Sequence, residues 1–132
     1  HKLKSYGVRG SLHNWISYFL CKRKMKVVVD GEASAEADVL SGVPQGTVLG
    51  PLLFLVHIND LPDCTTSKVR LFADDCLLYR KITSSKDQEE LQNDLKKLET
   101  WAETWRIKFN AKKCYILSIS NKWRCFCSYL YF

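Results

Sequence analysis

Two adjacent aspartates, Asp74 and Asp75, have the residue types and the spacing that could do chemistry in this sequence. They separate two short, β-prone runs, residues 68–73 and 76–80, so the order strand, tight turn, strand is predicted. The two charges repel each other, whereas a turn needs only one Asp or Asn for its local hydrogen bonds. A divalent cation would remove this conflict, because carboxylate oxygens are ligands that Mg²⁺ prefers. The alternative is a solvated Asp-Asp turn without an ion.

A second group of interest is the loop at residues 41–46, which reads Ser-Gly-Val-Pro-Gln-Gly. Glycine lets the backbone approach a ligand closely, and the Gln45 amide offers both a donor and an acceptor. These properties suit contact with a base or a base pair in a nucleotide pocket. A plain structural loop is the alternative when this segment is considered alone.

The motifs together resemble reverse transcriptases of non-LTR (LINE-like) retrotransposons, in order and in spacing. The resemblance lies in Ser-Gly-Val-Pro-Gln-Gly-Thr-Val-Leu-Gly-Pro-Leu-Leu-Phe at 41–54, Ile-Asn-Asp-Leu-Pro at 58–62 and Leu-Phe-Ala-Asp-Asp at 71–75. It continues through Trp101 and Trp105 and covers about residues 3–120 of the chain.

The resemblance implies a metal-binding role for the hairpin that contains the two aspartates. Asp74 and Asp75 would be catalytic carboxylates and metal ligands, and the intact enzyme would hold two Mg²⁺ ions. Phe72 and Ala73 of the same motif would lie beside the nucleotide and the template.

The resemblance also implies a nucleotide pocket. Pro44, Gln45 and Gly46 would line the site for the incoming nucleotide and the template base. Lys113 would lie near the phosphates of the nucleotide, although a solvated surface lysine is an equal alternative at this position. The family usually has Pro where this chain has Ala111, which is a small departure at a turn.

In the family a further catalytic Asp lies on a strand just before the segment that residues 3–8 match. The chain is therefore expected to hold a palm that is incomplete at its N-terminus, with residues 1–120 as the partial domain and 121–132 as an atypical tail. The intact parent would be an RNA-directed DNA polymerase that uses an RNA template, a DNA primer and dNTPs. The fragment alone is expected to be inactive. A non-catalytic remnant or a domesticated nucleic-acid-binding module is the alternative function.

Three helices are predicted from apolar residues at helical spacing. The first follows Ser11, which is predicted to be its N-cap. The second begins near Pro51. It is apolar nearly all round, and this pattern is typical of a buried helix. The third covers residues 85–105 and begins with a capping box of Ser85 and Gln88.

The predicted strands alternate with these helices without strict βαβ order. A hairpin is expected around the Asp30-Gly31 turn, and two more strands at residues 106–109 and 115–119. The fold class is therefore α+β. The resemblance implies a polymerase palm, which is a ferredoxin/RRM-like antiparallel sheet with packed helices.

Composition supports a globular domain with a basic surface. The 132 residues are 46% hydrophobic and carry a net charge of +6, which permits binding to a polyanion. The longest apolar run, residues 52–58, is too short to span a bilayer, so no membrane association is expected. Six cysteines without a metal-binding spacing, and no signal peptide, favour reduced thiols in an intracellular protein. His13 and His57 fit surface and core histidines.

Overall fold

The computed structural model describes residues 1–120 and 124–131. The chain divides into two compact units, His1–Ile58 and Asn59–Phe132, which are taken in turn. Helices and antiparallel strands mix in both units without βαβ alternation, so the predicted α+β class is confirmed.

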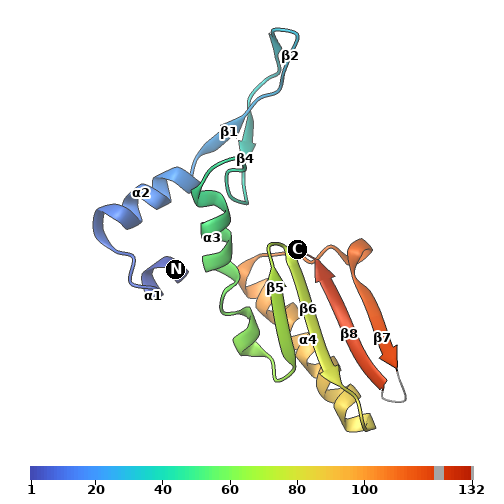
Figure 1. Ribbon diagram of the computed structural model, residues 1–132. Helices are drawn as coiled ribbons and strands as arrows, with labels where there is room; N and C mark the ends of the chain where they lie inside the picture. The colour runs from blue at the N-terminus through green and yellow to red at the C-terminus, as the bar shows by residue number, and fades with distance from the viewer. Residues whose placement is uncertain (121–123, 132) are drawn as a thin grey trace. The chain divides into compact units, whose positions relative to one another are not determined.

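The first unit combines short helices with an extended β arm, which Figure 1 shows in blue and teal. Two antiparallel ladders, β1 with β4 and β2 with β3, follow one another along this arm. The tip turns at Asp30 and Gly31, whose φ values of 51° and 86° are those of the predicted hairpin turn. The elements are α1 (Lys2–Ser5), α2 (Gly10–Leu20), β1 (Arg23–Met25), β2 (Val28–Val29), β3 (Glu32–Ala33), β4 (Ala37–Val39) and α3 (Leu49–Ile58).

Helix α2 begins earlier than its sequence suggests. Ser11 was predicted to cap it, but the N-cap is Arg9, whose side chain makes no capping hydrogen bond. The chain enters the helix through Gly10, whose left-handed φ of 63° costs glycine little. Ser11 therefore lies inside the first turn. Trp15 and Phe19 stack on the surface of α2 with ring centroids 5.7 Å apart.

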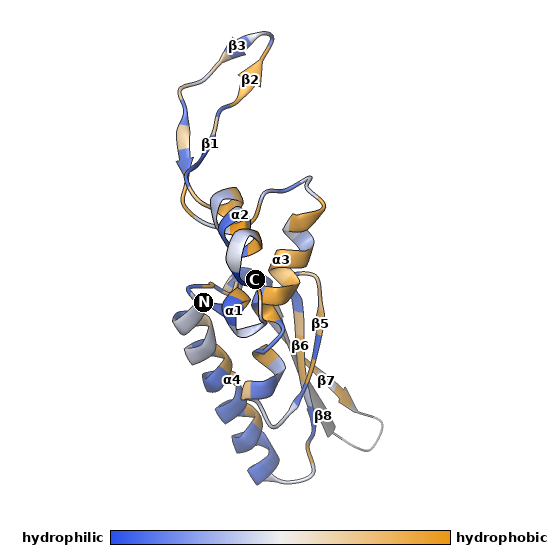
Figure 2. Cartoon of the chain, turned by 90° about the vertical axis from the view of Figure 1, so that its left-hand side faces the viewer, coloured by the Kyte–Doolittle hydropathy of each residue, from blue (hydrophilic) through white to orange (hydrophobic). Residues whose placement is uncertain are grey.

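Helix α3 is hydrophobic along most of its surface, as Figure 2 shows in orange. Gly50, Leu53 and Ile58 are buried, whereas Leu52 and Leu55 are 54% and 49% exposed. The prediction of a buried helix therefore holds for one side only. Within this unit α3 contacts α1, and the buried ammonium of Lys2 donates to the carbonyl oxygen of His57 near the end of α3. A cation at this position satisfies a helix C-terminal carbonyl.

The second unit is a four-stranded antiparallel sheet with one long helix on one face (Figure 1). The strand order is β5-β6-β8-β7, so β8 lies between β6 and β7, which run in the same direction on either side of it. Leu61, Leu78 and Leu98 are the centre of the core beneath the helix. The elements are η1 (Leu61–Cys64), β5 (Lys68–Phe72), β6 (Asp75–Lys81), α4 (Ser85–Trp105), η2 (Ala111–Lys113), β7 (Tyr115–Ser120) and β8 (Arg124–Tyr131).

Helix α4 covers the predicted range, but its capping box is shifted by one residue. The N-cap is Ser84, whose side chain accepts from the Asp87 backbone N–H, and Asp87 replaces Gln88 as the reciprocal acceptor. The Asp87 carboxylate accepts from both the backbone N–H and the hydroxyl of Thr83 and of Ser84. These hydrogen bonds, those from Thr83 first, hold the pKa of Asp87 well below its usual range. A charged acceptor for several donors explains the shift from Gln88.

The strand predicted at residues 106–109 is wrong, because these residues follow the end of α4. Residues 106–109 form no strand, since Arg106 takes a left-handed φ of 56° and the Ile107 N–H bonds back to Ala102 O at 2.9 Å. This arrangement ends the helix in the manner of a Schellman motif. The strand at 115–119 is confirmed as β7.

The predicted C-terminal tail contains an unexpected strand. Backbone pairing places β8 between β6 and β7, in the same unit as the residues before it. Residues 121–123 and 132 of the tail lie outside the described residues. A domain boundary at residue 120 stays a prediction. In the described part of the chain, no helix combines the length and apolarity needed to cross a membrane.

Candidate metal and nucleotide site

The two aspartates lie at a two-residue hairpin turn. Phe72 pairs with Asp75, so Ala73 and Asp74 form the turn and Asp75 begins β6. Ala73 has a φ of 49°, a left-handed conformation that costs a residue with a Cβ about 1 kcal/mol. Two-residue hairpin loops favour such a positive φ, so the hairpin itself accounts for this conformation.

The strand register puts Asp75 on the open face of the sheet. Leu71 pairs with Cys76 and Val69 with Leu78, and the buried members of these pairs face the core beneath α4. Because side chains alternate along a strand, Asp75 points to the opposite face, together with its partner Phe72. Phe72 is 81% exposed. The turn therefore presents an acid and an aromatic ring side by side on an uncovered surface.

Asp74 and Asp75 are both exposed. Within the described residues neither carboxylate has a hydrogen bond or an ion pair. Their mutual repulsion is therefore relieved by no cationic side chain in that part of the chain. The described residues also contain no group of three or more His, Cys, Asp and Glu arranged to hold a metal. The aspartates thus offer a two-residue donor set of hard oxygen ligands.

The far end of the hairpin is fixed to α4 through Asp94, which the sequence did not single out. Asp94 is 1% exposed and accepts from the backbone N–H of Ser67 at 2.7 Å and of Thr66 at 3.1 Å. It also accepts from the Thr66 hydroxyl at 2.9 Å and from the Lys97 ammonium at 2.8 Å. Burial raises the pKa of Asp94, but the bonds from Lys97, Ser67 and Thr66 outweigh it and hold the pKa well below its usual range.

Arg80, near the end of β6, strengthens the same anchor. Its guanidinium donates to Ser67 Oγ at 3.2 Å and to Thr66 Oγ1 at 3.3 Å, and pairs with the carboxylate of Glu90 on α4. One end of the hairpin is therefore held by charged groups on α4, while the acidic turn projects from the other end. No periodicity in the sequence signals contacts between groups so distant along the chain.

The Cys76 thiol, which follows the acidic turn, is unreactive near neutral pH. Cys76 is buried, and burial, with Cys64 and Cys114 as lesser contributors, raises the pKa of its thiol to about 12. Burial also raises the pKa of the Cys64 thiol. These thiols stay protonated near neutral pH and are poor nucleophiles and metal ligands there.

Lys113 lies in η2, at the same end of the sheet as the aspartates. The register that pairs Asp75 with Tyr131 also pairs Leu77 with Tyr129, and Tyr129 with Tyr115 at the start of β7. The turn before β7 therefore shares a sheet end with the β5–β6 turn, with β8 between them. Asn110 shapes η2, because its Oδ1 accepts from the Lys112 N–H at 3.2 Å. The structure thus brings Lys113 and the aspartates to one sheet end.

The predicted nucleotide loop belongs to the first unit and is held at both of its ends. The Arg23 guanidinium donates to the carbonyl oxygens of Ser41 at 3.1 Å and of Gly42 at 2.6 Å. At the other end Thr47 Oγ1 donates to Pro44 O at 2.8 Å and accepts from Gly50 N at 3.1 Å. The residues between these anchors are thereby kept in a fixed turn before α3.

The three residues at the centre of this loop differ in their exposure to solvent. Pro44 is half-buried, while Gln45 and Gly46 are exposed. Gly46 has a φ of 76°, which favours glycine at that position. The Gln45 amide has no hydrogen-bond partner among the described residues, so both its donor and its acceptor are available to a ligand. The loop belongs to the first unit, whereas the acidic turn and Lys113 belong to the second.

Comparison with known proteins identifies the family of the chain. Residues 1–129 match the family described as reverse transcriptase (RNA-dependent DNA polymerase). The chain is 34% identical over 116 residues to the RNA-directed DNA polymerase from mobile element jockey of Drosophila melanogaster. It is 34% identical over 101 residues to the probable RNA-directed DNA polymerase from transposon X-element of the same organism. It is 31% identical over 119 residues to the jockey polymerase of Drosophila funebris.

These matches cover most of this chain but little of the relatives. The three alignments span 81%, 72% and 83% of the chain, and 13%, 11% and 13% of the relatives' own lengths. No solved structure is significantly similar to the chain. The resemblance to reverse transcriptases of non-LTR elements, based on residues 41–75, is confirmed by the family and by the relatives.

Proposed function

Because the chain belongs to the reverse transcriptase family, we propose that it is part of an RNA-directed DNA polymerase in which Asp74 and Asp75 are metal-binding carboxylates. One observation carries this proposal: the two acids are adjacent at one hairpin turn, exposed, and without partners in the described chain. A structural turn would have no need of the second acid.

The proposal includes the polymerase palm as the fold of this domain, over residues 1–120. A palm requires an antiparallel sheet with helices on one face and acids on the open side, and the second unit has this arrangement around β5 and β6. Residues 121–132 would then be an atypical tail, although β8 pairs with the sheet.

The donor set fits a hard divalent cation, and Mg²⁺ is the proposed ion. Asp74 and Asp75 supply carboxylate oxygens, with no thiol or imidazole among the groups at the turn. When bound, such ions activate the primer hydroxyl and neutralise charge on the phosphates. The contribution of the chain itself would be to present both carboxylates at the turn of one hairpin, whose strands pair from Lys68–Tyr79 to Phe72–Asp75 and whose opposite end is anchored on α4.

The remaining site residues are assigned to the nucleic acid and the nucleotide. Gln45, with an unoccupied amide between Pro44 and Gly46, is suited to hydrogen-bond a base. Phe72, beside Ala73, offers an exposed ring on which a base can stack. Lys113 supplies a cation at the sheet end that holds the acids, where it would meet the phosphates of a dNTP. The partners of the intact protein would be an RNA template, a DNA primer and dNTPs.

Photocrosslinking tests this function. An RNA–DNA heteroduplex that carries 5-iodouracil near the primer end is irradiated with the chain, and the linked peptides are mapped by mass spectrometry. We expect linkage to Phe72, because its ring is 81% exposed beside the acids. Phe72→Leu should reduce the linkage about tenfold, since loss of a base–aromatic stack costs on the order of 1–3 kcal/mol.

Tyr18→Leu is the matched control, because Tyr18 is 84% exposed but lies on α2. This variant should leave the linkage at Phe72 unchanged. Linkage that never includes the peptide around Phe72, or that is equal in the two variants, would argue against a polymerase site at this hairpin.

A further inference from the structure

We propose that a cationic pocket between α1 and α2 binds a backbone phosphate of a nucleic acid strand, outside the acidic turn and the nucleotide loop. The pocket has a volume of about 420 Å³ and is lined by Lys4, Arg9, Gly10, His13 and Asn14. Its residues come from α1, from the segment between the helices, and from the first turns of α2. The inference rests on the proposed function insofar as that function supplies the nucleic acid.

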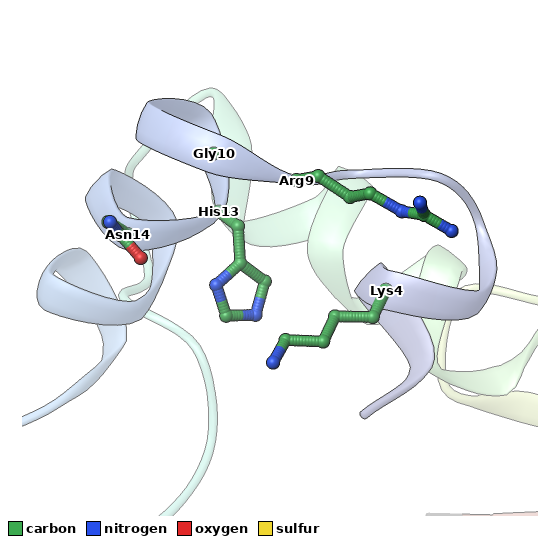
Figure 3. A pocket seen from close by; sticks show the side chains of 5 residues that line it. All are labelled: Lys4, Arg9, Gly10, His13 and Asn14. Carbon is green, nitrogen blue, oxygen red and sulfur yellow. The ribbon is translucent and has the colours of Figure 1, made fainter.

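Two of the lining residues, Lys4 and Arg9, carry positive charge, and no acid is among the lining residues. Figure 3 shows Lys4 and His13 reaching into the same space, while Arg9 extends along the other side of the Lys4 backbone. Within the described residues, none of these three side chains has a hydrogen bond or an ion pair. A pocket lined by basic residues and by no acid favours an anionic ligand. Each of the three side chains can donate to phosphate oxygens, and Arg does so in a bidentate fashion.

The charge distribution of the whole chain favours a polyanion at this place. Of the 20 Lys and Arg, seven precede Asp30, and no Asp or Glu occurs before that residue. The remaining 13 basic residues are outnumbered by the 14 acids, so the positive net charge of the protein comes from its first segment. Such an asymmetry is typical of a surface that binds nucleic acid.

The backbone at the pocket is compatible with an anion. Gly10 presents no side chain, and a Cβ built there would meet nothing within 4 Å. The N-cap Arg9 makes no side-chain capping bond, and the first turn of α2 contains no acid. The N–H groups of this turn therefore keep their partial positive charge, which adds to that of the cations. A volume of about 420 Å³ admits a phosphate together with its sugar, which favours a phosphodiester.

RNA binding in the presence of EDTA tests the pocket separately from the metal site. A fluorescein-labelled 12-nucleotide oligo(U) is titrated with the chain at several KCl concentrations. The double variant Lys4→Gln, Arg9→Gln should bind about tenfold more weakly at low salt, and its salt dependence, log K against log [KCl], should be shallower by about 2. Both side chains are exposed, so circular dichroism should show an unchanged melting transition.

Lys86→Gln, Lys96→Gln is the charge-matched control, because both lysines are exposed on α4. This variant should bind like the parent chain. A DNA oligonucleotide of equal length should show the same salt dependence as the RNA, since the phosphodiester is common to both. Equal affinities of the two double variants would overturn the proposal.

A local probe distinguishes a phosphodiester from other anions. The ring signals of His13 in NMR spectra should move on addition of the oligonucleotide, while those of His57 stay in place. A shift with inorganic pyrophosphate but not with RNA, or an equal shift with a 12-residue poly-Glu peptide, would overturn the assignment to nucleic acid. Loss of binding in the Lys4, Arg9 variant but not in Asp74→Asn, Asp75→Asn supports the pocket even if the acids hold no metal. If the experiment shows no binding at the pocket, the proposal of a metal site at Asp74 and Asp75 is unaffected.

Discussion

Replacing Asp94 by Ala is expected to lower the free energy of unfolding by about 3 kcal/mol, since buried donors left without a partner cost roughly 1–3 kcal/mol each. The substitution removes the acceptor of the Ser67 and Thr66 backbone N–H groups and of the Thr66 hydroxyl. Because these residues lead into β5, the hairpin that presents Asp74 and Asp75 would lose its anchor. Urea denaturation followed by circular dichroism measures the change.

Two neighbours on α4 serve as controls for Asp94. Asn93→Ala, at an exposed position, should change stability by less than about 0.5 kcal/mol. Lys97→Ala should cost less than about 1 kcal/mol, because the Lys97 side chain is 46% exposed and Asp94 keeps its other donors. A loss at Asp94 no larger than that at Lys97 would mean that the backbone bonds contribute little.

The Asp94 anchor also predicts the direction of the pH dependence. The pKa of Asp94 is lower in the folded chain than its unfolded value of about 4. Its contribution to stability is therefore complete above pH 4 and is lost as the pH falls from there toward the folded pKa. In Asp94→Asn this part of the acid sensitivity should be absent.

Replacing Gly50 by Ala is expected to destabilise the nucleotide loop, by about 1–3 kcal/mol for an overpacked contact. A Cβ on Gly50 would stand 2.5 Å from Pro44 O and 3.1 Å from Thr47 Oγ1. The closer atom belongs to the backbone, so relief requires the loop to move. Helix propensity alone predicts the opposite sign, a gain of up to about 1 kcal/mol, so the sign of the change decides between the two effects.

Proteolysis of the loop and its NMR amide signals measure this effect at Gly50. In Gly50→Ala, cleavage near Gln45 should be faster and the amide signals of residues 44–47 should move. Val48→Ala is the control, because Val48 is 95% exposed and should leave both unchanged. A more stable Gly50→Ala with unmoved loop signals would show that the close approach to Pro44 is absent.

Local patterns in the sequence predicted the elements that depend on local interactions. The hairpin around Asp74 followed from two β-prone runs at a tight turn, and the long helix from apolar residues at helical spacing. The capping box was displaced by one residue, because Ser84 and Ser85 both fit the pattern and only the structure shows Asp87 accepting several donors. The strand at 106–109 failed because those residues end α4.

Features that depend on contacts between residues distant in sequence could not be predicted from the sequence. Strand β8 is recognised by its pairing with β6 and β7, which are distant in sequence, and its aromatic run without periodicity gave no strand signal. Asp94 looked like one more polar residue on a helix, since nothing near it indicates that the segment before β5 will surround it. The acidic pair itself was evident from residue type, whereas the exposure of both carboxylates and their lack of partners among the described residues depend on the folded structure.

Manganese binding at the acidic turn is the most direct measurement of the central claim. Added in small amounts to the ¹⁵N-labelled chain, paramagnetic Mn²⁺ should broaden the amide signals of residues 73–76 before others, and excess Mg²⁺ should reverse the effect. Asp74→Asn, Asp75→Asn should abolish the broadening. The control Glu99→Gln, Glu103→Gln, which removes two exposed acids one helical turn apart on α4, should retain it. Absence of broadening at the turn, or equal broadening in Asp74→Asn, Asp75→Asn, would contradict a metal site at these aspartates.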